Sequence, residues 1–356
     1  MKMLKYIEVG IHTFELSQTL DKNQFNEVFN QMRTRGQLFH NKKGQESYTL
    51  RDKQIPGVQI ILYHIKKRNT YRVSIIVEPC RILGSNIPTE LYHYDKESYK
   101  ALKKHLNHYL EEMCIPGKLE NMPISRCDLT CNMVFCSQDY VDAYLRILKK
   151  SCLIPKYQVD HFKNNEKKAK DPQRANQHTY CIRCKQASFL CYDKINQLEM
   201  TGRCPERLDD LAILRLEAQL KRPSLKRALG KRALESNNKI LKAASGQAAL
   251  VISSYLNRMF PCSGTHLRYE DAVSAIRKVK KEKRREPMLS LLRKVSDSAT
   301  LDNAARKLDV SDKKLKKLYE EFDKQGVNPI TLPNSSSIAE IPPLNKLVCE
   351  ENILMK

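Results

Sequence analysis

The sequence predicts an α+β fold with a central antiparallel sheet and helices on one face. Segments with the two-residue alternation of strands stand in neighbouring pairs, and segments with helical spacing lie between them. This strand–helix–strand order occurs twice along the chain, which favours such a sheet. The chain has 356 residues, 41% of them hydrophobic, so it can bury a core and form two or three domains.

The first strand–helix–strand unit occupies the N-terminal part of the chain. Residues 6–12 alternate like a strand, and apolar residues between 25 and 32 recur at helical spacing. Two β-branched segments, 58–64 and 71–77, are separated by a short polar stretch, which predicts a hairpin. Residues 96–113 have their apolar side chains on one face of a helix.

The second unit repeats this order and completes a first domain, residues 1–223. Residues 126–135 form its first strand, and Ser137 is placed to cap the helix that follows. The lysine-rich stretch 163–177 predicts a loop. Three further strands are expected, at 179–183, 188–194 and 212–220.

The chain changes character at about residue 224. Residues 224–333 are basic and mostly helical in pattern, and three short helices are expected within 288–325. A helix, a short turn and a lysine-rich helix in that order resemble a helix-turn-helix. A small helical bundle with solvated charges has the same pattern. Residues 334–356 are rich in Ser, Pro and Asn and predict a flexible tail.

The charge balance favours a polyanionic partner. The chain has 63 Lys and Arg against 40 Asp and Glu, a net charge of +23 and a pI of about 9.5. Such an excess favours nucleic acid as the partner. We expect no membrane partner, because no apolar run approaches the length needed to cross a bilayer. Without a signal-peptide pattern, the 12 Cys predict reduced thiols in a cytoplasmic protein.

Tyr180 is a candidate nucleophile, because it stands at the head of the strand 179–183 and two residues after His178. A phenol has a pKa of about 10 and is a poor nucleophile on its own. It becomes useful when a base takes its proton and a cation stabilises the charge that develops. A tyrosine that only packs in the core suits the same position.

Asp128 and Glu217 are candidate metal ligands. Asp128 stands inside an otherwise apolar strand, where a carboxylate is costly unless it is paired or binds a metal. Arg215 and Glu217 are two residues apart and share one face of a strand. Carboxylates gathered from neighbouring strands would bind Mg²⁺ or Mn²⁺. Pairing of Asp128 with Arg126, and of Arg215 with Glu217, explains the same residues without a metal.

Lys194 is a candidate phosphate-binding residue. If the strand continues through Tyr192-Asp193-Lys194, Tyr192 and Lys194 point to the same side. A lysine directed into a metal site holds a phosphate as a point charge, although an edge strand also uses lysine to resist aggregation. The spacing Cys181-x-x-Cys184 suits zinc but lacks a second close pair of cysteines.

Taken in order, these residues resemble the rolling-circle replication initiators of phages and plasmids, and most of all the gene II/X-type family of filamentous phages. The resemblance covers most of the chain through short motifs. They are Arg126-Cys127-Asp128, Tyr180, Tyr192-Asp193-Lys194 with Glu199, Leu214-Arg215-Leu216-Glu217, and the segments 77–83 and 326–333.

The resemblance implies a site-specific single-strand DNA endonuclease that also rejoins DNA through a 5′-phosphotyrosine. It implies Tyr180 as the nucleophile, with Lys194 and Arg215 on the phosphate. The implied ligands of Mg²⁺ or Mn²⁺ are Asp128, Glu217 and Glu199. The implied partners are double- and single-stranded origin DNA, a host helicase, a host polymerase and a second copy of the chain in a homodimer.

The sequence also departs from this family. Its plasmid members often have Ile-Gly after the nucleophilic tyrosine, where this chain has Cys181-Ile182, so Tyr192 stays open as the nucleophile. A non-enzymatic DNA-binding regulator that uses residues 288–325 is the first alternative, and an RNA- or ribosome-bound protein is the second. Asp128 and Glu217 favour the enzyme, because binding alone does not require them.

Overall fold

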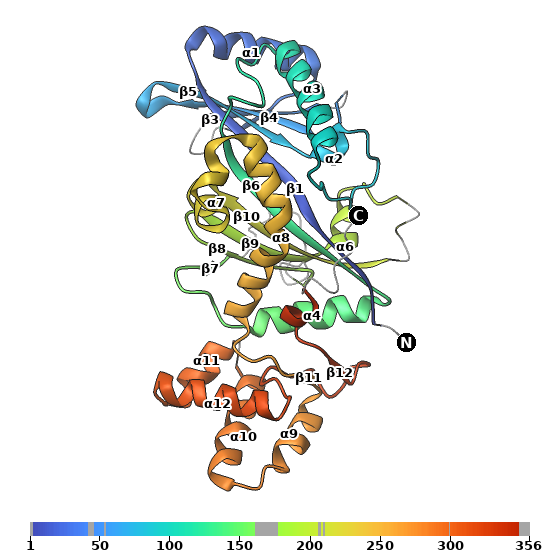
Figure 1. The fold of residues 1–356 in the computed structure, drawn as a ribbon, viewed down its shortest axis with the longest axis vertical. Helices are drawn as coiled ribbons and strands as arrows, with labels where there is room; N and C mark the ends of the chain where they lie inside the picture. Colours follow the sequence, from blue (N-terminus) through green and yellow to red (C-terminus); the bar gives the residue numbers. More distant parts are fainter. Residues whose placement is uncertain are drawn as a thin grey trace. The chain divides into compact units, whose positions relative to one another are not determined.

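The computed structural model describes residues 3–41, 46–52, 55–160, 177–205, 208, 211–298 and 300–348. Figure 1 shows an α+β fold with a large antiparallel sheet, which confirms the predicted class. The ten strands that these residues contribute to the sheet follow the order β2-β3-β4-β5-β1-β6-β10-β9-β8-β7. The loop expected at 163–177 lies outside the described residues, apart from Gln177.

The chain divides into two compact units, and each is made of segments far apart in sequence. Unit 1 holds Met1–Glu8, Cys131–Glu217 and Ala249–Met355, and unit 2 holds Val9–Thr130 and Ala218–Ala248. The boundary expected near residue 223 rests on composition alone. Instead, the described part of the chain passes from one compact unit to the other at four points, which lie inside three strands and one helix.

Unit 2 contains the first predicted strand–helix–strand pattern. Its elements are β1 (Leu4–Leu20) from Val9 onward, α1 (Lys22–Arg35), β2 (Phe39–Asn41), β3 (Glu46–Arg51), β4 (Val58–Ile65), β5 (Thr70–Val77), α2 (Pro79–Ile82), α3 (Lys96–Glu112), most of β6 (Ile124–Phe135), the end of β10 (Ala212–Lys221) and α7 (Arg222–Leu229). The predicted hairpin is β4 and β5, which pair antiparallel with Val58 opposite Val77.

The strands of unit 2 have one face against α1 and another that carries polar groups. Phe25 of α1 lies against Tyr71 of β5, with ring centroids 4.8 Å apart. Val73, two residues further along β5, is fully buried on this side. Because successive strand residues point to opposite faces, Arg72 and Ser74 project from the other side.

Unit 1 contains the second pattern and the C-terminal helices. Its elements are β1 up to Glu8, the end of β6, α4 (Gln138–Lys150), β7 (Gln158–Val159), β8 (Thr179–Arg183), β9 (Ala187–Asp193), α6 (Lys194–Met200), β10 up to Glu217, α8 (Asn237–Met259) from Ala249 onward, β11 (His266–Leu267), α9 (Tyr269–Arg277), α10 (Glu282–Ser296), α11 (Leu301–Arg306), α12 (Asp312–Lys324), β12 (Glu340–Ile341) and α13 (Leu344–Leu347). Ser137 caps α4 as predicted, since its side chain accepts a hydrogen bond from the amide of Asp139 at 3.2 Å.

Two expectations for unit 1 need correction. The strand β9 does not continue to Lys194, because Asp193 accepts a hydrogen bond from the amide of Asn196 and caps α6. The tail is not free throughout, since β12 pairs antiparallel with β11 and places Ile341 opposite His266. Residues 349–356 lie outside the described part of the chain. Within that part, every helix is too short or too polar to span a membrane.

Candidate functional site

The pairing of β8 and β9 places Tyr180 and Tyr192 on opposite faces of unit 1. Tyr180 lies opposite Cys191, and Thr179 lies opposite Tyr192. Tyr180 therefore shares its face with Phe189, whose ring stacks on Tyr255 of α8 at 4.7 Å. Tyr192 points to the other face of the two strands.

Tyr180 is buried on the face that α8 covers. Its side chain is only 6% exposed, and its hydroxyl is hydrogen-bonded to Ser151 at the end of α4. Burial raises the pKa of Tyr180 to about 12, and the Ser151 contact offsets only part of that rise. The structure thus does not bring Tyr180 together with Arg215 and Glu217.

Tyr192 is the tyrosine that meets the predicted charged residues. Its hydroxyl donates a hydrogen bond to Glu217 Oε2 of β10 at 3.3 Å. Arg215, two residues earlier on the same strand face, is fully buried and also reaches the Tyr192 hydroxyl. Burial, followed by the charge of Glu217, raises the pKa of Tyr192 well above its usual value, so the phenol stays protonated at neutral pH.

A chain of polar contacts continues from Arg215 to β1. Arg215 Nε donates to Asn132 Oδ1 at 2.7 Å, and Asn132 Nδ2 donates to Glu8 Oε2 at 3.3 Å. Glu8, Asn132 and Glu217 are 7%, 1% and 4% exposed. We call these five residues, Glu8, Asn132, Tyr192, Arg215 and Glu217, the unit 1 polar cluster. Four of its members are buried and Tyr192 is partly exposed, and the hydrogen bonds that join them restrain their side chains.

Asp128 belongs to a second set of charges, in unit 2. It is 1% exposed, accepts a short hydrogen bond from Thr13, and pairs with Arg126 Nε at 3.0 Å. Arg126 also reaches Glu15 at 3.6 Å, and Arg72 reaches Glu15 at 3.4 Å. Acids and bases alternate along this set, so the structure favours the pairing of Asp128 with Arg126 that the sequence left open.

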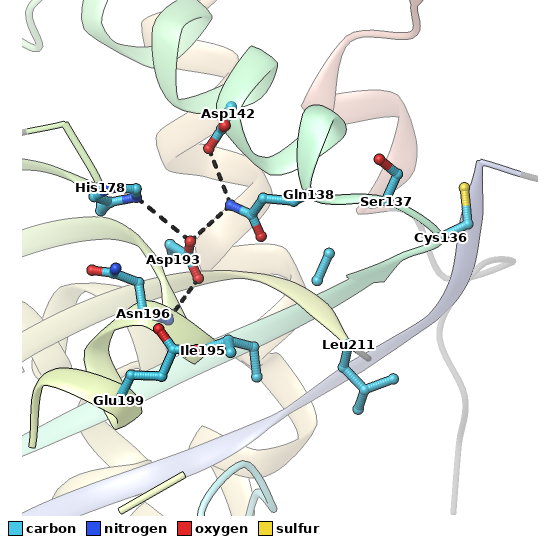
Figure 2. Close-up of a pocket in the computed structure, with 11 residues that line it drawn as sticks. Cys136, Ser137, Gln138, Asp142, His178, Asp193, Ile195, Asn196, Glu199 and Leu211 are labelled. Atoms are coloured by element: carbon cyan, nitrogen blue, oxygen red, sulfur yellow. Dashed lines mark hydrogen bonds and ion pairs between the residues drawn. The ribbon is translucent and has the colours of Figure 1, made fainter. Parts of the chain in front are cut away.

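A pocket on unit 1 gathers different acidic residues (Figure 2). It has a volume of about 400 Å³ and is lined by residues of α4, β9 and α6 together with His178. Ligand atoms of Asp142, His178 and Asp193 lie within 4.8 Å of one another, and they form the one such group of three that the described residues contain. Glu199, predicted as a metal ligand, also lines this pocket.

Lys194 lies in α6 and not in the strand β9. It is the first residue of α6 and is 5% exposed, and its ammonium group donates to Gln197 Oε1 at 2.8 Å. Asp142 and Asp193, which both line the pocket, were not among the residues predicted from the sequence. A signal for Asp193 was present, because an aspartate at the end of a strand and three residues before Asn196 suits a helix cap. Asp142 had no such signal.

Comparison with known proteins adds no assignment. No protein-family model matches the chain, and no curated protein matches its sequence.

Proposed function

We propose that this protein is a DNA-nicking and rejoining enzyme of the rolling-circle initiator type, with Tyr192 as its nucleophile. The observation that carries the proposal is the hydrogen bond from the Tyr192 hydroxyl to Glu217 Oε2, at 3.3 Å and beside the buried Arg215. A nucleophile, a base and a cation in contact are the minimum needed for attack on a phosphodiester. The net charge of +23 supports DNA as the substrate.

Each residue has a defined role in the proposed reaction. The Tyr192 oxygen forms a bond to phosphorus as the bond from phosphorus to the 3′ oxygen breaks. Glu217 takes the phenolic proton and returns it to the departing 3′ oxygen, and Arg215 offsets the charge that develops. The products are a free 3′ hydroxyl and a 5′ phosphate joined to Tyr192. The reverse reaction closes the strand.

The three predicted metal ligands, Asp128, Glu217 and Glu199, do not form one site in this structure. Both carboxylate oxygens of Asp128 already have partners in unit 2, and Glu217 faces Tyr192 in unit 1. Glu199 lies in the pocket instead. The proposed reaction therefore uses no ion held jointly by Asp128, Glu217 and Glu199. The proposed dependence on Mg²⁺ or Mn²⁺ requires another ligand set.

A covalent-adduct assay tests the nucleophile. The full chain is incubated in Mn²⁺ with a random-sequence single-stranded oligonucleotide pool labelled at the 3′ end, and with supercoiled DNA that carries candidate origins. We expect a labelled adduct on a denaturing gel for the natural chain and for Tyr180→Phe, but not for Tyr192→Phe. An adduct that survives in Tyr192→Phe and disappears in Tyr180→Phe would return the role to Tyr180.

A DNA-binding regulator is the second candidate function. It is favoured by α12, where Lys313, Lys314, Lys316 and Lys317 are all exposed next to the short helix α11. Such a protein would bind DNA without metal and would form no adduct under any condition of the assay above. Origin DNA, a host helicase, a host polymerase and a homodimer remain proposed partners of the enzyme only.

A further inference from the structure

The pocket on unit 1 offers a set of donors suited to a metal ion. Asp142 comes from α4, His178 from the turn before β8, and Asp193 from the end of β9. Figure 2 shows their polar ends pointing toward one another across the pocket. No lysine or arginine is among the described residues that line it. Two carboxylates therefore face each other there without a cation lining the same cavity.

The amide of Gln138 lies between these two carboxylates. Its Nε2 donates to Asp142 Oδ1 at 3.0 Å and to Asp193 Oδ2 at 2.8 Å. A neutral amide group thus occupies a position that suits a cation, because both carboxylates point at the same nitrogen. Rotation of the amide by half a turn would present its oxygen instead, which is a suitable ligand for a hard cation.

His178 is the third donor of this group. Its side chain is 38% exposed and pairs with Asp193, while among the described residues no hydrogen bond reaches its buried Nδ1 atom. It lies 3.6 Å from Asp193 Oδ2, which exceeds normal hydrogen-bonding distance. Two ligands that each lie about 2.1 Å from one ion are separated by roughly 3–4 Å. The spacing of these two atoms therefore suits a shared metal better than a direct contact.

Asp193 is positioned for such a role by the cap of α6. The amide of Asn196 donates to Oδ1 at 3.0 Å, which fixes the carboxylate and leaves Oδ2 directed into the pocket. The Asp193 side chain is 4% exposed, so the cost of burying its charge is high unless a cation or several donors offset it. The cap thus holds Oδ1, and Oδ2 faces the pocket, where the amide of Gln138 donates to it in place of an ion.

We propose that Asp142, His178 and Asp193 bind a divalent transition-metal ion, for which Mn²⁺ is the probe. The imidazole nitrogen favours a transition metal over Mg²⁺ and Ca²⁺, and the carboxylate oxygens suit Mn²⁺. Glu199, which lines the same pocket, and the rotated amide of Gln138 offer further oxygens. This assigns the metal to the pocket and not to Asp128 and Glu217.

Metal binding without DNA tests this inference separately from the proposed nicking activity. The metal-free full chain is titrated with Mn²⁺, and free Mn²⁺ is followed by its electron paramagnetic resonance signal. We expect one tight site in the natural chain. Asp142→Asn and His178→Ala should each weaken Mn²⁺ binding at least by the roughly 10- to 100-fold that loss of an outer-shell partner costs.

Two control variants locate the site. Asp139→Asn changes an exposed carboxylate on the same helix, and Glu217→Gln changes the unit 1 polar cluster. Both should bind Mn²⁺ like the natural chain, and circular dichroism checks that every variant is folded. No tight Mn²⁺ site in the natural chain, or a site lost in Glu217→Gln but kept in both pocket variants, would overturn the assignment whatever the adduct assay shows.

Discussion

Arg215 is the largest fully buried side chain among the described residues, and its guanidinium is held by Asn132 and Tyr192. Its removal leaves the carboxylates of the unit 1 polar cluster buried without their cation. We therefore expect Arg215→Met to lower the free energy of unfolding by about 3–5 kcal/mol. Urea unfolding measures this change. The matched variant Arg203→Met, at an exposed position of unit 1, should stay within about 0.5 kcal/mol of the natural chain.

His266 predicts a pH-dependent stability. It is 1% exposed, its Nδ1 contacts the carbonyl of Ile330 at 2.7 Å, and burial lowers its pKa to about 4. The unfolded chain, with a histidine pKa of about 6.5, binds the proton more readily than the folded chain does between these values. Stability should therefore fall as the pH drops from about 6.5 to about 4.

The size of this effect follows from the same shift. At about 1.4 kcal/mol per pKa unit, the loss is on the order of 3 kcal/mol. Urea unfolding at pH 7 and at pH 4.5 measures it, and His266→Asn should reduce the difference between the two pH values, because asparagine can still donate to Ile330 but does not titrate. An unchanged difference in His266→Asn would place the pH dependence in other groups.

At the scale of elements, a close crossing in unit 1 depends on Gly264. A Cβ atom there would lie 2.4 Å from the backbone of Val327, next to the bridge between Thr265 and Val327. We expect Gly264→Ala to destabilise the chain by more than about 1 kcal/mol, because backbone cannot move aside as a side chain can. A second glycine, Gly246 in α8, provides the matched control.

The control variant is Gly246→Ala. A Cβ at Gly246, inside α8, meets nothing within 4 Å, so alanine should stabilise the helix by about 0.5–1 kcal/mol. Thermal unfolding of both variants compares the two effects. Similar changes in both would mean that the Gly264 crossing is looser than described.

Most strands and helices could be predicted from the sequence, because their periodicity is local. The hairpin of β4 and β5, the helix α3 and the cap at Ser137 were all expected within a few residues. The end of β9 before Lys194 was not expected, because Tyr192-Asp193-Lys194 alternates like a strand. The strand ends there because Asp193 accepts a hydrogen bond from the amide of Asn196 and caps α6. The first of the helices expected within 288–325 begins earlier than predicted, because α10 starts at Glu282 and contains Pro287.

The candidate site was predicted only in part, since strand faces depend on register. The sequence placed Arg215 and Glu217 on one face, which the spacing of two residues alone determines. It gave no means to decide between Tyr180 and Tyr192, because their orientation depends on how β8 pairs with β9. Asp142 and Asp193 meet through tertiary packing of α4 on β9, which no local pattern reports.

For the whole molecule, the net charge of +23 predicts DNA binding that weakens steeply with salt. If α12 contacts phosphates, replacing Lys313, Lys314, Lys316 and Lys317 with Gln should reduce the slope of log affinity against log salt by about 3, at roughly 0.7 per contact with single-stranded DNA. Fluorescence anisotropy with a labelled oligonucleotide measures the slope. The control Lys100→Gln with Lys104→Gln removes two exposed charges of α3, and an equal effect per lysine there would show that the contact is nonspecific.

The alternation along β10 has a consequence for folding. Arg215 and Glu217 point to one side of the strand while Leu214 and Leu216 point to the other, and all four are buried. A slip of one residue against the neighbouring strand would exchange the two sides. The charged groups of Arg215 and Glu217 would then lie among aliphatic side chains. The ionic residues thereby penalise every slip of this strand by an odd number of residues, even where they add little to stability.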